Sequence, residues 1–385
     1  MRNIIVLGAG MVGSALAKDL STVHNVLLTD VNYEVLLKTK EEFSNIEILQ
    51  LDVNNDESLN KVLEGKDVVL SAVPGFLGYK TLEKIIINKK NVVDISFFPE
   101  NALELNQLAR ENNVTAIVDC GVAPGMGNVI LGYHNETHKL ESFNCLVGGL
   151  PKEKKWPFCY KAPFSPVDVI EEYTRPARYV ENGNIVVRSP LTDCELIEFE
   201  KIGTLEAFNS DGLRSIIFTM PHIKNMKEKT LRYPGHVEYI RVLKESGFFS
   251  DQIINDLNIS VLDFTSKVLF KEWKLDPLEE EFTVMRITLE GYNENGNKEK
   301  IIYNLFDEFS QKTKISSMAR TTGYTATAAI NLFLDGVFEE KGVFPPELIG
   351  RHRSCFNYFM SYLKERDINY EKEVISISLL FLMFL

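Results

Sequence analysis

The chain has 385 residues, of which 45% are hydrophobic and 25% charged, and its formal net charge is −12 at pH 7. These values are typical of a globular protein long enough for two domains. The negative charge argues against nucleic acid or an anionic membrane as a partner, because the Lys and Arg residues are scattered and form no basic stripe.

The first thirty residues contain a glycine-rich turn between a predicted strand and a predicted helix. An apolar run over residues 2–7 precedes Gly8-Ala9-Gly10-Met11-Val12-Gly13, and a helical pattern follows over 14–20. In dinucleotide sites the three glycines allow the turn, the approach of the pyrophosphate and the packing of helix on strand. The helix N-terminus then favours the phosphates. The pattern predicts dinucleotide contacts from Gly8, Gly10, Met11, Val12, Gly13 and Asp30, although a glycine-rich turn of an ordinary α/β domain is an alternative.

Asp30, at the end of the second predicted strand, indicates which dinucleotide binds. Its carboxylate can accept hydrogen bonds from both ribose hydroxyls and would repel a 2′-phosphate, and residues 31–33 supply no Lys or Arg. We therefore expect NAD rather than NADP. FAD is less expected, since no second flavin-type signature is present.

Strand and helix patterns alternate to about residue 137. Strands are predicted at 46–51, 67–73, 91–95 and 114–119, with helices at 55–64, 78–88 and 99–112. This alternation predicts an α/β fold with a Rossmann-type doubly wound parallel sheet. Ligands of such sheets lie beyond the carboxyl ends of the strands. That rule adds as cofactor contacts Asp52, Val53, Ala72, Val73, Pro74 and Ser96.

The pattern changes after residue 138. Strands are predicted at 142–147, 185–188, 196–199, 282–289 and 300–305, with a hairpin turn at Asn295-Gly296 and helices at 165–173, 236–246 and 260–270. These predict an inserted α+β domain on a largely antiparallel sheet. The expected division is a dinucleotide-binding domain (1–137), a substrate-binding and dimerisation domain (138–318), a return segment on the first domain (319–372) and an apolar tail (373–385). The tail is either a buried strand or a non-native terminus, and the site should lie between the domains.

The five cysteines are odd in number and widely spaced, and the six histidines form no His-Glu-x-x-His motif. We therefore expect no disulfide framework, no metal site and a cytoplasmic protein. Cys120 could be a nucleophile, but nothing nearby activates it, and a small buried residue is the alternative.

Two further side chains could carry chemistry. Arg232 lies beside Tyr-Pro-Gly, and a guanidinium fixed by such a turn suits a carboxylate, although a surface salt bridge explains it equally well. His236 could be a general base, since its ordinary pKa lies near neutrality, although a capping or packed histidine is the alternative.

Several motifs resemble the saccharopine dehydrogenase-like superfamily, up to about residue 370. They lie at 93–100, 119–128, 206–208, 211–213, 230–236 and 320–323. Within the superfamily the chain is most similar to the L-lysine 6-dehydrogenase branch. Saccharopine reductases carry an acid in their substrate site where this chain has Ala123, which argues against a saccharopine-type substrate.

The resemblance implies oxidation of the ε-amino group of L-lysine by NAD, giving 2-aminoadipate 6-semialdehyde and ammonia. It implies substrate contacts from Arg232, Cys120, Arg320, Thr321 and Arg175. A general base is needed because an ammonium has no lone pair, and His236 and Asp119 are the candidates. The alternatives are a saccharopine or carboxynorspermidine reductase and a catalytically silent NAD-binding scaffold or sensor. The expected partners are a small amino-acid substrate and further copies of the chain, in a dimer or tetramer.

Overall fold

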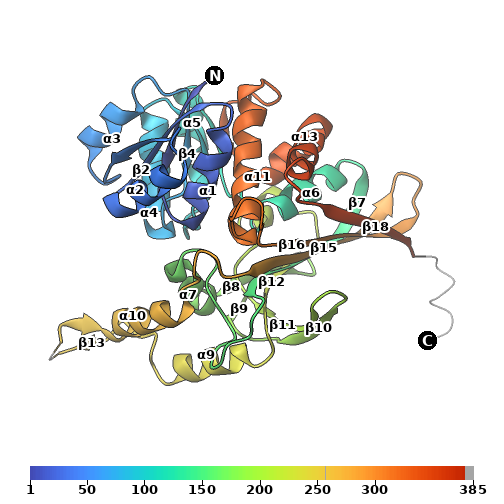
Figure 1. Ribbon diagram of the computed structural model, residues 1–385. Helices are drawn as coiled ribbons and strands as arrows, with labels where there is room; N and C mark the ends of the chain where they lie inside the picture. The colour runs from blue at the N-terminus through green and yellow to red at the C-terminus, as the bar shows by residue number, and fades with distance from the viewer. Residues whose placement is uncertain (256, 378–385) are drawn as a thin grey trace, which may run out of the picture.

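The computed structural model describes residues 1–255 and 257–377, in which two large sheets are stacked one above the other (Figure 1). The upper sheet and its helices contain most of the N-terminal third of the chain, and the lower sheet contains most of the remainder. One continuous core cluster includes Ile4 of the upper sheet, Met285 of the lower sheet and Ile330 of a helix that contacts both sheets. The two sheets therefore share apolar packing as well as a boundary.

The upper sheet has seven strands, all parallel, in the order β17-β6-β5-β4-β1-β2-β3. The bounds are β1 (Asn3–Leu7), β2 (Asn25–Asp30), β3 (Glu47–Gln50), β4 (Val68–Ser71), β5 (Asn91–Asp94), β6 (Thr115–Ile117) and β17 (Gly342–Phe344). Strands β1 to β6 follow the Rossmann order, which confirms the predicted fold class. The seventh strand, β17, comes from the C-terminal part of the chain and was not predicted.

Helices cover both faces of this sheet, so its inner strands are buried on both faces and read as apolar runs. These helices are α1 (Met11–Leu20), α2 (Tyr33–Glu42), α3 (Asp56–Leu63), α4 (Gly75–Ile87), the 3₁₀ turn Ala102–Leu105, α5 (Asn106–Glu111) and α6 (Met126–Asn135). The predicted helices at 55–64 and 78–88 correspond to α3 and α4.

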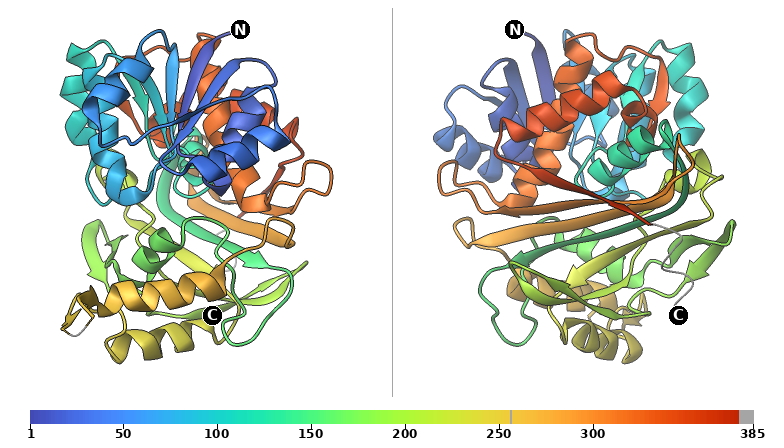
Figure 2. Two further views of the ribbon diagram at one scale, coloured as in Figure 1. Left: turned by 60° about the vertical axis from the view of Figure 1, so that its left-hand side comes forward. Right: turned by 90° about the vertical axis from the view of Figure 1, so that its right-hand side faces the viewer.

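The lower sheet has nine strands and is largely antiparallel, as predicted, since only β7 and β12 pair in parallel among its described pairings. The bounds are β7 (His138–Pro151), β8 (Ala177–Glu181), β9 (Asn184–Arg188), β10 (Glu195–Phe199), β11 (Gly203–Asn209), β12 (Asn225–Arg232), β15 (Glu281–Asn293), β16 (Lys298–Glu308) and β18 (Tyr370–Ser376). The Asn295-Gly296 turn joins β15 to β16, with Gly296 at φ +77. Figure 2 shows the long strands of this sheet crossing beneath the upper one.

The remaining elements lie around these sheets. In Figure 1 helix α9 (His236–Glu245) lies at the bottom, and α7 (Pro166–Thr174) and α10 (Val261–Trp273) lie at the left, with the ribbon β13 (Ile253–Ile254) and β14 (Ile259–Ser260) beyond α10. The others are α8 (Ile216–Thr219), α11 (Ser317–Leu334), α12 (Pro346–Gly350) and α13 (Arg353–Lys364).

The segment after residue 317 returns to the upper sheet. Helix α11 packs along α1 and also contacts β5 and β15, so it joins the two sheets. Asp19 of α1 anchors this segment: its carboxylate accepts hydrogen bonds from Thr327 Oγ1 (2.6 Å), Tyr362 Oη (2.7 Å) and Arg366 Nε (2.8 Å). The limits proposed for the domains remain predictions, although each sheet is built almost wholly from one of the predicted regions.

The apolar tail is only partly described. Residues 373–376 belong to β18, the edge strand that pairs with β16, and residues 378–385 lie outside the described residues. Most side chains of β18 are exposed, so this part of the tail is an edge strand and not a buried one. Within residues 1–255 and 257–377, no helix has the length and apolar character needed to cross a bilayer.

The Asp19 anchor yields a stability prediction. Asp19→Ala leaves Arg366 and two hydroxyl groups without their acceptor, so it should lower the free energy of unfolding by about 3 kcal/mol in a urea titration. Asp56→Ala is the matched control: Asp56 pairs with Lys84 at 2.6 Å but is largely exposed, and its loss should cost less than about 1 kcal/mol. Equal losses for the two variants would contradict the anchoring role.

Candidate functional site

A cavity of about 500 Å³ lies between the two sheets. On the upper side it is lined by segments that follow β1, β2, β4, β5 and β6, the edge at which ligands of parallel sheets bind. On the lower side it is lined by parts of β7, β12, α7, α11 and the loop after β11. The cavity therefore joins the predicted cofactor region to residues of the second sheet.

The glycine-rich turn has the geometry that a dinucleotide requires. Gly8 has φ +101, and a Cβ there would lie 2.5 Å from the Ala72 carbonyl oxygen. A Cβ on Gly13 would overlap the Gly8 carbonyl oxygen, so Gly13 permits close packing of α1 on β1. Gly10 has no atom within 4 Å of a Cβ position and lines the cavity. The N-terminus of α1, which has no acidic residue in its first turn, is therefore open to a pyrophosphate.

Asp30 is held at the edge of this turn. Its carboxylate accepts hydrogen bonds from the Ala9 N–H (2.7 Å) and the Asn32 N–H (2.8 Å), and it lines the cavity. The predicted contacts Met11, Val12, Ala72, Val73, Pro74 and Ser96 line it as well. Together these residues fit a nicotinamide dinucleotide, with Gly10 and the α1 N-terminus at the pyrophosphate and Asp30 at a ribose.

Asp52 and Val53 do not line the cavity. The exposed Asp52 carboxylate accepts from the Asn54 N–H, and Val53 is buried beneath α4, where its carbonyl accepts from Lys84 Nζ. Both follow β3, the outermost strand on that side of the sheet, so they lie beyond the end of the cavity.

Arg232 lines the cavity and is only 2% exposed, so the surface salt-bridge interpretation is wrong. It is the last residue of β12, and its guanidinium donates to Glu172 Oε2 (2.8 Å), Tyr173 Oη (3.1 Å) and Tyr160 Oη (3.3 Å). The guanidinium also lies 4.4 Å from the centre of the Tyr160 ring. Arg232 is thus held rigidly, with Glu172 as the carboxylate that a substrate carboxylate would have to replace or share.

His236 does not reach the cavity. It begins α9 behind Arg232, where Nε2 pairs with Tyr173 Oη (2.9 Å) and Nδ1 with the Phe158 carbonyl oxygen (2.9 Å). Burial, followed by the nearby Arg232 charge, lowers the pKa of His236 to about 3. A general-base role for His236 is not supported, and the packed-histidine alternative describes its position.

Asp119 lines the cavity, but its carboxylate is already bound by a buried arginine. Arg214 donates to Asp119 Oδ1 through Nη2 (2.8 Å) and Nε (3.1 Å), and its Nη1 donates to the Phe98 carbonyl oxygen. The carboxylate is therefore already held by a charge-assisted pair with a guanidinium of this chain. The sequence did not identify Arg214 as a residue of the site.

The other predicted substrate contacts lie outside the cavity lining. The Cys120 thiol is fully buried against the Thr325 carbonyl, and burial raises its pKa well above the usual range. Arg320 binds Asp307 (3.1 Å), and Thr321 bonds within α11. Arg175 pairs with Glu171 (3.0 Å) and stacks on Phe97, 4.5 Å from the ring centre.

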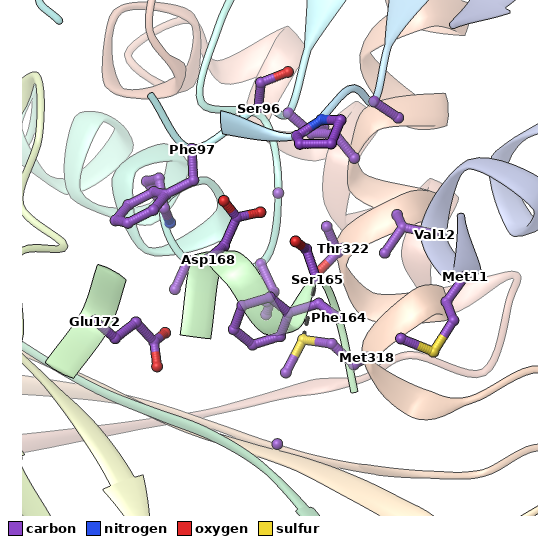
Figure 3. A pocket seen from close by; sticks show the side chains of 18 of the residues that line it. Met11, Val12, Ser96, Phe97, Phe164, Ser165, Asp168, Glu172, Met318 and Thr322 are labelled. Carbon is purple, nitrogen blue, oxygen red and sulfur yellow. Dashed lines mark hydrogen bonds between the residues drawn. The ribbon is translucent and has the colours of Figure 1, made fainter. Parts of the chain in front are cut away.

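Helix α11 does contribute to the cavity, through a different face. Met318 and Thr322, four residues apart, line it, whereas Arg320 and Thr321 point elsewhere because each residue turns the helix by about 100°. In Figure 3 Met318 and Thr322 lie between α1 and α7. The predicted motif at 320–323 therefore contacts the site through Thr322.

Acidic side chains missed by the sequence analysis line the lower side of the cavity. Asp168 and Glu172 project from α7 in Figure 3, and the others are Asp211 and Glu228. Burial raises the pKa of Asp168 and of Glu172, and it raises that of Glu228 to about 8. Arg232 is the single Lys or Arg among the described residues that line the cavity.

Glu228 could have been identified from the alternation of side chains between the two faces of a strand. Side chains two residues apart share a face, so a strand ending at Arg232 places Thr230 and Glu228 beside it. All three line the cavity. No strand was predicted from the sequence over the residues of β12, so the motif at 230–236 was not connected to Glu228. Among the described residues, no group of three or more His, Cys, Asp or Glu side chains is arranged to hold a metal ion.

Two family models match the chain. The saccharopine dehydrogenase NADP binding domain matches residues 4–117, and the saccharopine dehydrogenase C-terminal domain matches residues 119–368. A solved structure, apo histidine-tagged saccharopine dehydrogenase (L-Glu forming) from Saccharomyces cerevisiae, is similar with a TM-score of 0.80 and 20% identity, over 97% of this chain and 100% of that one. At this identity the likeness shows a shared fold.

Curated relatives carry related names. The mitochondrial alpha-aminoadipic semialdehyde synthase of Mus musculus is 23% identical over 90% of this chain and 45% of its own length, so the chain spans about half of that relative. The saccharopine dehydrogenase [NADP(+), L-glutamate-forming] of Pyricularia oryzae is 22% identical over 90% of this chain and 93% of its own length. The saccharopine dehydrogenase [NADP(+), L-glutamate-forming] of Saccharomyces cerevisiae is 27% identical over 65% of this chain and 59% of its own length.

The open space at Gly10 gives a test of the cofactor site. Gly10→Ala should leave stability to urea nearly unchanged, because no atom opposes the new methyl group. The methyl group would occupy the pyrophosphate position, so the Kd for the dinucleotide should rise at least about tenfold, or about 1.4 kcal/mol. NADH fluorescence measures the binding. Gly13→Ala is the comparison variant, which should lose stability as well, and undiminished binding by Gly10→Ala would place the cofactor elsewhere.

The burial of His236 gives a pH dependence of stability. The folded state protonates His236 only near pH 3, whereas an unfolded histidine is protonated near pH 6.5. Between pH 6.5 and pH 3 the unfolded state therefore binds more protons than the folded state. The stability that neutral His236 contributes above pH 6.5 is lost as the pH falls towards 3. His236→Gln, which keeps hydrogen-bonding groups but does not titrate, should show a shallower decline in the free energy of unfolding. Parallel declines for variant and wild type would refute this account.

Proposed function

The chain belongs to the saccharopine dehydrogenase family, and on this premise we propose that it is an oxidoreductase acting on the CH–NH group of an amino acid. A nicotinamide dinucleotide would occupy the glycine-rich end of the cavity, and the amine would occupy the end formed by the lower sheet. The observation that supports this proposal is the single cavity that joins the Gly8–Gly13 turn to Arg232 and Glu228. When bound, the nicotinamide supplies the hydride acceptor or donor.

The residues of this chain would perform the remaining tasks. Arg232, fixed by two tyrosines and Glu172, would bind a substrate carboxylate, because a rigid guanidinium pairs well with a planar anion. The apolar side chains of Phe97, Phe164 and Met318 would exclude water while the C–N carbon is held in place. Loss of hydride leaves an iminium carbon, which water then attacks to release an aldehyde and an amine.

Saccharopine is the first candidate substrate. The names of the curated relatives support the saccharopine alternative better than the lysine 6-dehydrogenase reaction expected from the sequence. Oxidation of this secondary amine in the L-glutamate-forming direction would give glutamate and 2-aminoadipate 6-semialdehyde.

L-lysine is the second candidate, because of the charges in the cavity. Saccharopine has three carboxylates, whereas Arg232 is the one cationic side chain among the described residues of the lining and already pairs with Glu172. Lysine brings one carboxylate and two ammonium groups, which suit a lining with five carboxyls besides Asp30: Asp119, Asp168, Glu172, Asp211 and Glu228. Ala123, where the reductases have an acid, also lines the cavity.

We propose NAD as the preferred nucleotide. The matching family model is described as NADP binding, and relatives are named for NADP(+). In this chain the Asp30 carboxylate lines the cavity at the end of β2, where it would bind a ribose and repel a 2′-phosphate. The cytoplasmic location and the dimer or tetramer remain predictions, and mitochondrial proteins are among the relatives.

One assay tests the proposal. Wild-type protein with NAD should produce reduced nucleotide with saccharopine or with L-lysine, and kcat/KM should be at least about tenfold higher with NAD than with NADP. Asp30→Ala should narrow that ratio, since it removes the repulsion of the 2′-phosphate. Turnover of saccharopine alone would identify saccharopine as the substrate, and turnover of L-lysine alone would identify L-lysine. NADH binding without turnover of either amine, in both directions of reaction, would support the scaffold alternative.

A further inference from the structure

Three of the carboxyl groups that line the substrate end of the cavity are paired with arginines. Asp119 pairs with Arg214 (2.8 Å), Glu172 with Arg232 (2.8 Å) and Asp211 with Arg178 (2.8 Å). Each of these three carboxylates is at least four-fifths buried, and each has its own guanidinium. Charged side chains that are buried in proteins are usually paired in this way.

Asp168 of α7 forms no ion pair among the described residues, but the Ser165 side chain and the Gly75 N–H hydrogen-bond to it. Glu228 departs furthest from this arrangement. It lies on the cavity face of β12, only 5% exposed, and no Lys or Arg within the described ranges forms an ion pair with it. The thiol of Cys145 on β7, a weak donor, hydrogen-bonds to its carboxyl group, and Tyr179 Oη donates to its backbone carbonyl oxygen (2.6 Å). A Cβ on Gly212 would overlap Glu228 Oε1, so the absence of a side chain at Gly212 makes room for this carboxyl.

We propose that Glu228 binds the reacting amine of the substrate and takes its proton before hydride transfer. This inference rests on the proposed function, because it assigns a residue to the amine that the oxidoreductase acts on. The substrate ammonium would neutralise Glu228 as the three arginines neutralise Asp119, Glu172 and Asp211. The ligand class is therefore a protonated amine attached to the carbon that is oxidised, whether primary or secondary.

The surroundings of Glu228 agree with this role. Burial is the main cause that raises its pKa to about 8, and the charge of Glu172 is the next. The titratable groups that face it from adjoining elements are Cys145 of β7, Tyr179 of β8, Glu172 of α7, Asp211 after β11 and Asp119 after β6. In this acidic setting a free carboxyl keeps its proton near neutral pH, and an arriving ammonium favours the ionised form.

The proton transfer balances in atoms and charge. The ionised Glu228 carboxylate takes one proton from the ammonium nitrogen, so that the amine becomes neutral and the carboxyl becomes an acid. The nitrogen lone pair then forms the C=N bond as the carbon loses its hydride to the oxidised dinucleotide, which gives an iminium and the reduced dinucleotide. Addition of water and cleavage of the C–N bond yield an aldehyde and an amine.

Glu228→Gln tests the assignment. The amide keeps the volume and removes both charge and basicity, so kcat/KM should fall at least about a hundredfold. The wild-type profile of log kcat/KM should rise with pH through an apparent pKa near 8, and the variant should lose that limb. Glu281→Gln is the matched control, since Glu281 is buried in the same sheet with a pKa raised to about 8 but lies outside the cavity. Glu228→Gln with near wild-type turnover and an unchanged limb would overturn the proposal.

Gly212→Ala tests the same carboxyl without changing its charge. The backbone of Gly212 lies outside the left-handed region, so alanine is tolerated there, but its methyl group would displace Glu228 Oε1. We expect kcat to fall at least about tenfold while NADH binding is retained. Unchanged kcat in both Gly212→Ala and Glu228→Gln would contradict the role of this position.

A binding measurement keeps the test independent of turnover and of the folding of variants. Calorimetric titration of wild-type protein and NADH with L-lysine or saccharopine, in two buffers of different ionisation enthalpy at neutral pH, reports proton exchange. Proton release is expected, since the ammonium ionises a carboxyl whose pKa is about 8. Binding without proton release would overturn the inference. Wild-type protein that turns over neither amine would instead defeat the proposed function, while proton release on binding would still support the role of Glu228 in binding.

Discussion

The pairing of buried charges where the two sheets meet is the constraint on which the rest of the site depends. Arg214 binds Asp119 after β6 and the Phe98 carbonyl after β5, so one guanidinium links the lower part of the molecule to two loops of the upper sheet. Arg232 fixes α7 through Glu172 in the same way. A buried charge without a partner costs several kcal/mol, so each pair permits only a narrow range of positions for the segments it joins. The carboxylates of both pairs line the cavity, so the pairs determine part of its charge pattern.

The cofactor half of the site could be predicted from the sequence because its determinants are local. The three glycines and Asp30 act within one strand–turn–helix–strand unit, and their spacing alone specifies the backbone. The structure places Gly8, Gly10, Gly13 and Asp30 along one wall of the cavity. The parallel sheet followed from the same kind of information, since strand and helix periods alternate along the chain.

The substrate half could not be predicted in this way, because it depends on strand register and helix phase across distant segments. Arg232 was identified, but its place at the end of β12 was not, and without that strand nothing connected it to Glu228. A one-residue difference in helix phase separates the predicted Thr321 from the Thr322 that lines the cavity. His236 lies next to Arg232 in space but behind it, a distinction that only tertiary packing makes.

The strand β17 has a consequence for how the chain is made. It pairs with β6 and closes the upper sheet, yet it is synthesised about two hundred residues later, after the whole region that forms β7 to β16. During translation β6 is thus an edge strand with unpaired backbone groups on an apolar sheet. A nascent chain that stalls before residue 342 exposes that edge to aggregation and to chaperones. The dinucleotide-binding sheet is therefore the first sheet to be started, but it is completed only after strands β7 to β16 of the lower sheet have been synthesised.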